Sequence, residues 1–178
     1  MNAVRLWLLA SLLASPAFAQ ANNPDGCPKP PSCPAVQGKA PPFGLPLVSG
    51  GRTSLRELLE KKRPIVIDFW RHDCAPCLAD LVELEKLAVE WGDKVSVQLV
   101  HVGGSEEQMS AKLDKYGGHL ACAFDGNQCT GTRWCVEAFP QLWVVDANGV
   151  LRAHLSGEQK SFAASVRAAV APLLAAGK

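Results

Sequence analysis

The hydrophobic pattern changes its period several times along the chain, and each change predicts a boundary between a strand and a helix. Apolar, largely β-branched residues run together over 65–69 and again over 95–102, as in buried strands. Between them, apolar positions recur with helical spacing from Cys77 to Trp91, and Gly92 is placed to end that helix. The sequence therefore predicts a strand–helix–strand unit, which is typical of an α/β domain.

Capping and turn residues predict the remaining elements. Ser54 opens a capping box for a short helix to about Lys61, and Ser105 caps a helix that ends near Tyr116. Helices alternating with strands early and a hairpin late predict a mixed sheet with helices on both faces. The other expected elements are a short strand at 120–124, a short helical turn at 132–137, a β-hairpin formed by 142–145 and 150–155, and a closing helix over 161–176.

The N-terminal region differs in composition from this α/β pattern. Residues 1–19 have one early positive charge, Arg5, then an apolar core and a small-x-small pattern ending at Ala19, which is typical of a cleaved signal peptide. Residues 20–42 contain seven prolines and few apolar side chains, so we predict a flexible arm there. The folded domain is expected over 43–178. We therefore predict a periplasmic or otherwise exported protein, with no later segment able to span a membrane.

Charge and length narrow the choice of partners. The chain has 18 Lys and Arg against 17 Asp and Glu, a balance that argues against nucleic acid or an anionic membrane surface as the main partner. The part after the expected signal peptide is long enough for one domain with its own core. Disulfides are therefore not required for folding, and the seven cysteines call for an explanation.

Cys74 and Cys77 form a C-x-x-C motif between a predicted strand and a predicted helix. Two thiols at this spacing close a reversible disulfide, and a helix N-terminus stabilises a thiolate on the first of them. We expect Cys74 to attack and the more buried Cys77 to resolve the mixed disulfide, while Pro76 stiffens the turn. A zinc site would need a second ligand pair, and no second C-x-x-C exists. We therefore predict redox chemistry by this disulfide, with no cofactor and no metal.

The other five cysteines are expected to be structural. Cys27 and Cys33 would close a small loop within the arm, and Cys122 and Cys129 flank a predicted turn. Cys135 is a further candidate to pair with either of the latter two, so one cysteine is left over unless chains pair. Metal binding by the arm cysteines and a second redox relay near the active site remain as alternatives.

Several segments at consistent spacing carry a resemblance to a known family. The strand before the C-x-x-C motif resembles that of thioredoxin, and the wider pattern is similar to the exported TlpA/ResA-like disulfide reductases. The similarity runs from about Ala40 to the C-terminus. It implies a thioredoxin fold, a central mixed β-sheet flanked by helices, with an extra strand–helix insertion at about 103–137. The segments that carry it are 40–45, 51–55, 66–70 and 140–149.

The resemblance also implies roles for residues around the cysteines. Asp68 would be a buried carboxylate that exchanges a proton with Cys77, although a solvated strand-end carboxylate is the simpler alternative. Phe139–Pro140 would be a cis peptide bond facing the cysteines, which leaves the neighbouring backbone free to pair with a substrate strand. Pro140 as an ordinary strand-start proline and Trp70 as a core residue are the corresponding alternatives. The substrate-binding residues implied are Trp70, Ala75, Pro76 and Phe139.

One departure from the family pattern concerns the residue before the first cysteine. The family usually has Trp there, whereas this chain has Asp73. A carboxylate disfavours a neighbouring thiolate, while Arg71 and His72 act in the opposite direction, so the net effect on Cys74 stays open.

The resemblance implies an envelope thiol–disulfide oxidoreductase that reduces protein disulfides, for example in an apocytochrome c. A membrane dithiol carrier of the DsbD or CcdA kind would donate the electrons. The same fold also supports thiol oxidases and isomerases. A copper- or zinc-handling module is the alternative from another class, with Cys74, Cys77 and His72, or Cys27 and Cys33, as ligands.

Overall fold

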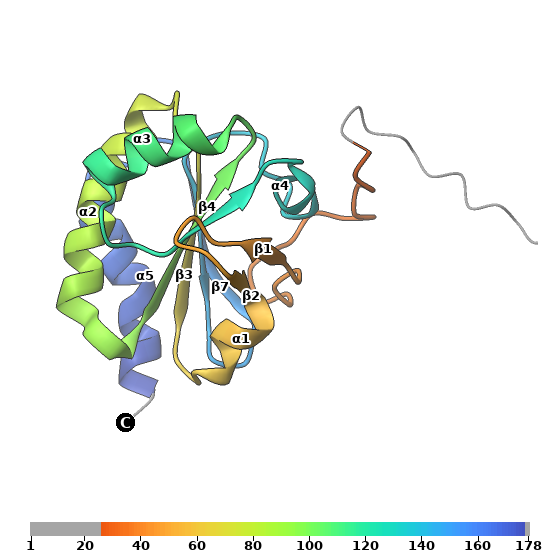
Figure 1. Cartoon of the computed structure of the whole chain (residues 1–178). Helices are drawn as coiled ribbons and strands as arrows, with labels where there is room; N and C mark the ends of the chain where they lie inside the picture. The colour runs from red at the N-terminus through yellow and green to blue at the C-terminus, as the bar shows by residue number, and fades with distance from the viewer. Residues whose placement is uncertain (1–25, 177–178) are drawn as a thin grey trace, which may run out of the picture.

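A five-stranded mixed sheet forms the centre of the molecule (Figure 1). The computed structural model describes residues 26–176, so the predicted signal peptide lies outside the described residues. The sheet has the order β5-β4-β3-β6-β7, with β3 and β4 parallel, β4 and β5 parallel, and β6 antiparallel to both β3 and β7. The strands are β3 (Ile65–Trp70), β4 (Ser96–Val102), β5 (Cys122–Asp125), β6 (Gln141–Val145) and β7 (Leu151–Ser156).

Helices cover both faces of the sheet, as the sequence predicts. Three of them pack on one face, while two short helices and a two-stranded antiparallel sheet cover the other (Figure 1). The first group is α2 (Ala75–Trp91), α3 (Glu106–Tyr116) and α5 (Phe162–Ala176), and a 3-10 turn, η1 (Gly92–Lys94), connects α2 to β4. The second group is α1 (Leu55–Glu60), α4 (Cys129–Arg133), β1 (Gly44–Pro46) and β2 (Arg52–Ser54). None of the helices between residues 26 and 176 combines the length and apolar character needed to cross a bilayer.

The predicted helix caps are confirmed. The Ser54 hydroxyl accepts a hydrogen bond from the Glu57 backbone N–H at 3.2 Å, and Ser105 forms a complete capping box with Gln108. Gly92 ends α2 with a φ of 53°, a conformation that glycine adopts without strain. Local side-chain chemistry is therefore sufficient to place these helix ends.

One local prediction is wrong, and one small sheet was not predicted. The expected helical turn at 132–137 is instead α4, which begins at Cys129 because the Asp125 carboxylate accepts hydrogen bonds from the backbone N–H groups of Thr130 and Gly131. Asn127 adds a further cap, since its side-chain oxygen accepts a hydrogen bond from the Cys129 backbone N–H at 3.1 Å. The small β1–β2 sheet was not expected, because strands of three residues are too short to show a period.

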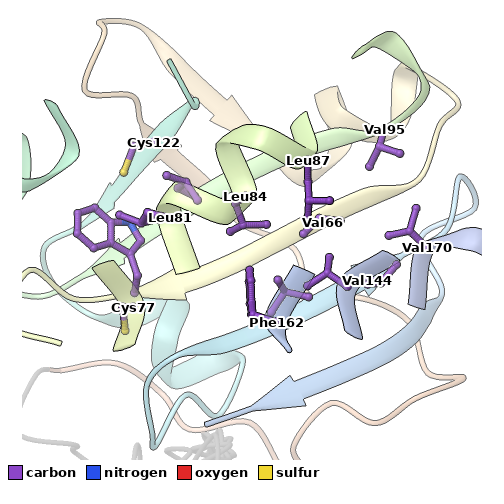
Figure 2. Packing of buried hydrophobic residues seen from close by; sticks show 14 of the residues in the cluster. Val66, Cys77, Leu81, Leu84, Leu87, Val95, Cys122, Val144, Phe162 and Val170 are labelled. Carbon is purple, nitrogen blue, oxygen red and sulfur yellow. The ribbon is translucent and has the colours of Figure 1, made fainter. Parts of the chain in front are cut away.

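The alternation of β3 side chains divides the core into two layers. Val66 and Trp70 belong to the layer under α2, whereas Ile67 and Phe69 belong to the opposite layer. Figure 2 shows the first layer, where leucines of α2 lie over Val66 and Val144, with Cys77 at one end of the cluster. Asp68 lies between Val66 and Trp70 on β3, so its side chain is directed to the same layer as α2. The packing thus places the start of α2 over the carboxyl end of β3.

The arm is covalently tied to the domain, contrary to the predicted independent arm. Cys27 is bonded to Cys129 and Cys33 to Cys135, with Cα–Cα distances of 5.1 and 5.6 Å. The expected Cys27–Cys33 and Cys122–Cys129 pairs are therefore wrong, and Cys122 is a free, buried cysteine. Each arm cysteine instead bonds to one of two cysteines with the same spacing, Cys129 at the start of α4 and Cys135 shortly after its end.

Backbone hydrogen bonds continue this attachment beyond the disulfides. The Gln37 N–H donates to the Leu151 carbonyl at 2.8 Å, and the Leu151 N–H donates to the Gly38 carbonyl at 2.9 Å. The Ala40 N–H donates to the Gly149 carbonyl at 2.9 Å. The segment after Cys33 thus adds backbone contacts to the β6–β7 hairpin, so the arm belongs structurally to the domain.

Candidate active site

The C-x-x-C motif forms a disulfide at the N-terminus of α2. Cys74 is the N-cap residue, and its sulfur accepts a hydrogen bond from the Cys77 backbone N–H at 3.3 Å. Pro76 occupies the first turn, where its missing N–H has no helical partner to lose. The Cys74 sulfur therefore lies where free N–H groups and the helix dipole stabilise a thiolate.

The two sulfur-bearing residues differ in access. Cys77 is fully buried and packs in the α2 core layer with Leu81, whereas Cys74 is half-buried and reaches the surface beside exposed Ala75. An incoming sulfur atom can thus reach Cys74 but not Cys77. This asymmetry fits a thiol–disulfide exchange in which the outer cysteine forms the mixed disulfide and the inner one resolves it.

Asp68 is a buried carboxyl group, so the alternative of a solvated strand-end residue is wrong. Its exposed fraction is 0%, and within residues 26–176 neither of its oxygens makes a hydrogen bond. Burial, and next the charge of Asp80, raise the pKa of Asp68 well above its usual range. A carboxyl group in this state can take up and return a proton inside the α2 layer.

Asp80 is a second buried acid that the sequence reasoning did not identify. It lies one turn after Cys77 on α2 and is 7% exposed. Burial, with smaller contributions from Glu158 and Glu83, raises its pKa to about 7. The available signal was its position, three residues after Cys77 and four before Leu84, which places it on the buried face of the helix.

An ion pair controls the charge directly before Cys74. Both carboxylate oxygens of Asp73 accept hydrogen bonds from the Arg71 guanidinium, each at 2.9 Å. The hydrogen bond from Arg71 lowers the pKa of Asp73 to about 2. The Arg71 guanidinium also lies 5.8 Å from the ring centroid of Phe139. The carboxylate beside Cys74 is therefore ionised but paired, which reduces its repulsion of a thiolate.

Pro140 lies at the same edge of the sheet as the dithiol. The Phe139–Pro140 peptide bond is cis, as the resemblance implies, and Pro140 leads into β6. Gln141 pairs with Phe69 near the carboxyl end of β3, the end that continues to Cys74. Phe139 is half-buried, whereas Trp70 is fully buried in the core layer under α2, as in the alternative of a core residue.

The cysteines outside the C-x-x-C motif are either protonated or bonded in disulfides. Cys122 is buried with its sulfur 3.8 Å from the Met109 sulfur, and burial raises its pKa to about 12, so this thiol stays protonated. Cys27 and Cys33 are engaged in disulfides, which removes the thiolates that the metal-binding alternative requires. Across the part of the chain that the structure describes, no group of three or more His, Cys, Asp and Glu side chains is placed to hold a metal ion.

Comparison with known proteins agrees with this fold and with thiol–disulfide chemistry. Residues 36–154 match the AhpC/TSA family. The chain is 30% identical over 117 residues to Thioredoxin-like protein YneN of Bacillus subtilis, covering 64% of this chain and 67% of that relative. It is also 30% identical over 121 residues to Thiol:disulfide interchange protein DsbE of Allochromatium vinosum, covering 67% of this chain and 65% of that protein. The chain thus spans about two thirds of the length of these curated relatives.

Solved structures show the same fold at lower identity. A structure from Chlorobium tepidum, described as a thiol:disulfide interchange protein DsbE, superposes with a TM-score of 0.73 at 20% identity, covering 79% of this chain and 99% of that one. A secreted disulfide oxidoreductase of Mycobacterium tuberculosis gives a TM-score of 0.65 at 20% identity, with coverages of 74% and 96%. The family match over residues 36–154 and the 30% identical relatives show that the chain belongs to the AhpC/TSA family and is a thiol–disulfide oxidoreductase, and the solved structures show its thioredoxin-like fold.

Proposed function

We propose that this oxidoreductase acts outside the cytoplasm as a reductant of protein disulfides. The observation that carries the proposal is the position of an accessible Cys74 at a helix N-terminus directly outside a buried Cys77. Export is supported by the signal-peptide pattern of residues 1–19 and by the two further disulfides, since structural disulfides persist in oxidising compartments.

The reaction begins with the reduced dithiol. The Cys74 thiolate attacks one sulfur of a substrate disulfide, so a mixed disulfide forms and the other substrate sulfur leaves as a thiolate that takes up a proton. Cys77 then loses its proton and attacks the Cys74 sulfur. The substrate leaves as a dithiol with two electrons gained, and the Cys74–Cys77 disulfide is the oxidised product. A membrane dithiol carrier of the DsbD or CcdA kind would return the enzyme to the dithiol.

The buried acids provide a proton acceptor for the second step. Cys77 has no access to solvent, so its proton must move to a group within the α2 layer. Asp68 is directed into that layer from β3, and Asp80 lies on the buried face of α2 one turn after Cys77. In this proposal Asp68 accepts the proton of Cys77. Asp80, whose pKa of about 7 matches neutral conditions, sets how readily Asp68 ionises.

The substrate backbone would bind at the edge formed by Pro140. A cis proline has no N–H, and the residues before it are not part of β6, which leaves backbone groups there to pair with an extended substrate segment. Ala75, Pro76 and Phe139 border this edge, so they are the side chains that a bound segment would contact.

Two cysteine variants test the order of attack. We expect Cys74→Ser to abolish reduction of insulin disulfides, and Cys77→Ser to accumulate a stable one-to-one mixed disulfide that mass spectrometry detects. Cys122→Ala is the matched control, because it removes a cysteine outside the dithiol and should retain turnover. An active Cys74→Ser together with an inactive Cys77→Ser would reverse the assignment.

The direction of electron flow needs a separate measurement. Equilibration of the dithiol with a redox buffer of known potential gives its reduction potential. A value of about −270 mV supports the proposed reductant, whereas a value of about −120 mV would place the protein among thiol oxidases.

A further inference from the structure

A buried imidazole connects the sheet to the loop ahead of Cys74. His101 lies in β4, is fully buried and pairs in register with Trp70 of β3. Its Nε2 atom accepts a hydrogen bond from the backbone N–H of His72 at 3.1 Å. The His72 Nδ1 atom lies 3.2 Å from the same nitrogen. The loop is thus held to β4 by a contact that is not part of the sheet ladder.

Aromatic neighbours fix the orientation of this imidazole. The Trp70 ring meets it edge-on with centroids 4.7 Å apart, and the Phe124 ring of β5 stacks against it at 6.0 Å. The His72 ring stacks against it at 5.3 Å. Because rings from β3, β5 and the loop surround His101, its Nε2 acceptor is held in place before any substrate binds.

The segment after β4 restricts His72 from a second direction. Gly104 has a φ of +68°, and a Cβ atom at this position would lie 2.7 Å from the His72 Cε1 atom. Only glycine combines this backbone conformation with such a close approach. His72 is therefore confined between His101 and the backbone of residue 104.

A tight turn links the backbone of His72 to that of Cys74. The Cys74 backbone N–H donates a hydrogen bond to the Arg71 carbonyl at 3.3 Å, which closes a turn around His72 and Asp73. A displacement of the His72 backbone would therefore rotate the residue that caps α2.

The hydrogen bond requires a neutral His101, because a protonated imidazole has no acceptor. Burial, followed by the charges of His72 and Arg71, lowers the pKa of His101 to about 4, while Asp73 acts in the opposite direction. On the β5 side, the titratable neighbour is Cys122, whose thiol is protonated. The acceptor is therefore present at neutral pH and is lost only as the pH falls toward about 4.

We propose that His101 is a positioning residue for the dithiol, which acts through the His72 backbone to hold Cys74 in the N-cap position of α2. The proposal rests on the function assigned above to Cys74 as the attacking thiol. His101 itself touches neither substrate nor sulfur; it fixes the geometry in which the Cys74 sulfur receives the helix N–H groups.

The test compares substitutions that remove or keep the acceptor. We expect His101→Leu to slow alkylation of reduced Cys74 by iodoacetamide about two- to tenfold at neutral pH, the range that one hydrogen bond contributes. The equilibrium constant with dithiothreitol should change by a similar factor. His101→Gln retains an acceptor oxygen and should restore most of both values. His119→Gln, a substitution of an exposed histidine, is the matched control and should behave as the parent.

A second variant covers the case in which His101→Leu does not fold. Gly104→Ala changes an exposed residue and leaves His101 intact, but its Cβ displaces His72, so we expect slower alkylation here as well. The proposal would be overturned if folded His101→Leu had the alkylation rate and equilibrium constant of the parent. If His101→Leu fails to fold, the same result in Gly104→Ala would overturn it. Either result is distinct from failure of the proposed function, which would appear as activity remaining in Cys74→Ser.

Discussion

The paired disulfides between the arm and α4 allow a quantitative prediction about stability. Cys27 and Cys33 lie six positions apart along the chain, as do their partners Cys129 and Cys135. Each bridge on its own would join residues 102 positions apart. Once either bridge is present, however, the second closes only a small ring of about 14 residues through the two short segments.

The expected magnitudes follow from the size of these rings. Losing one bridge opens the small ring. Because that ring restricts the unfolded chain, its loss lowers the free energy of unfolding by about 3 kcal/mol. Losing both also releases the large loop, which adds about 4.7 kcal/mol. The variant without both bridges should therefore lose about 8 kcal/mol, which is more than twice the cost of removing either bridge alone. Since domains of this kind are stable by about 5–15 kcal/mol, that variant should be near unfolding.

Urea titration followed by tryptophan fluorescence measures these differences in the free energy of unfolding. The variants are Cys33→Ser with Cys135→Ser, Cys27→Ser with Cys129→Ser, and all four together, each kept with an oxidised Cys74–Cys77 pair. Cys33 and Cys135 are at least partly exposed, so the first pair isolates the bridge from packing losses. If the four-serine variant were as stable as either two-serine variant, the argument from the small ring and the large loop would be refuted.

Three further predictions concern the site. Asp68→Asn should slow decay of the mixed disulfide most strongly near neutral pH, and a parental pH–rate profile would contradict its role as proton acceptor. The raised pKa of Asp80 means that the folded state holds its proton more tightly than the unfolded state, so the parent loses stability as the pH rises from about 4 to about 7. Asp80→Asn should remove that loss in urea titrations, gaining stability over the parent at about pH 8 but not at about pH 4. Arg71→Ala unpairs Asp73 and should slow alkylation of Cys74 by less than about tenfold, with added salt reducing the difference, because the ion pair is partly exposed.

The predictions that the structure confirms depend on signals within a few residues. The C-x-x-C motif, the Ser54 cap and the helical period of α2 are each encoded in one short window, so the sequence alone places the dithiol at the start of a helix. The burial of Asp68 required the resemblance to thioredoxin as well, because a polar residue at the end of an apolar strand reads equally well as solvated.

The disulfide pairing that sequence reasoning missed depends on contacts between distant segments. The partners of Cys27 and Cys33 lie 102 positions away. Spacing along the chain favours disulfides between cysteines that are close in sequence. The disulfides that form depend instead on where the folded arm places Cys27 and Cys33. Asp80 was missed for another reason. A charged residue is normally expected at the surface, although the helical period places this position on the buried face of α2.

The interleaved order of the two disulfides has a consequence for biosynthesis. Because the chain is made from its N-terminus, Cys27 and Cys33 exist well before Cys129 and Cys135 do. An oxidant that paired cysteines in order of appearance would join Cys27 to Cys33 and trap the arm in a non-native ring. Correct maturation therefore requires either that oxidation waits until the sheet has folded or that an isomerase reopens early bridges. On the second route, a protein that itself exchanges disulfides depends, during its own synthesis, on the same chemistry supplied by another protein.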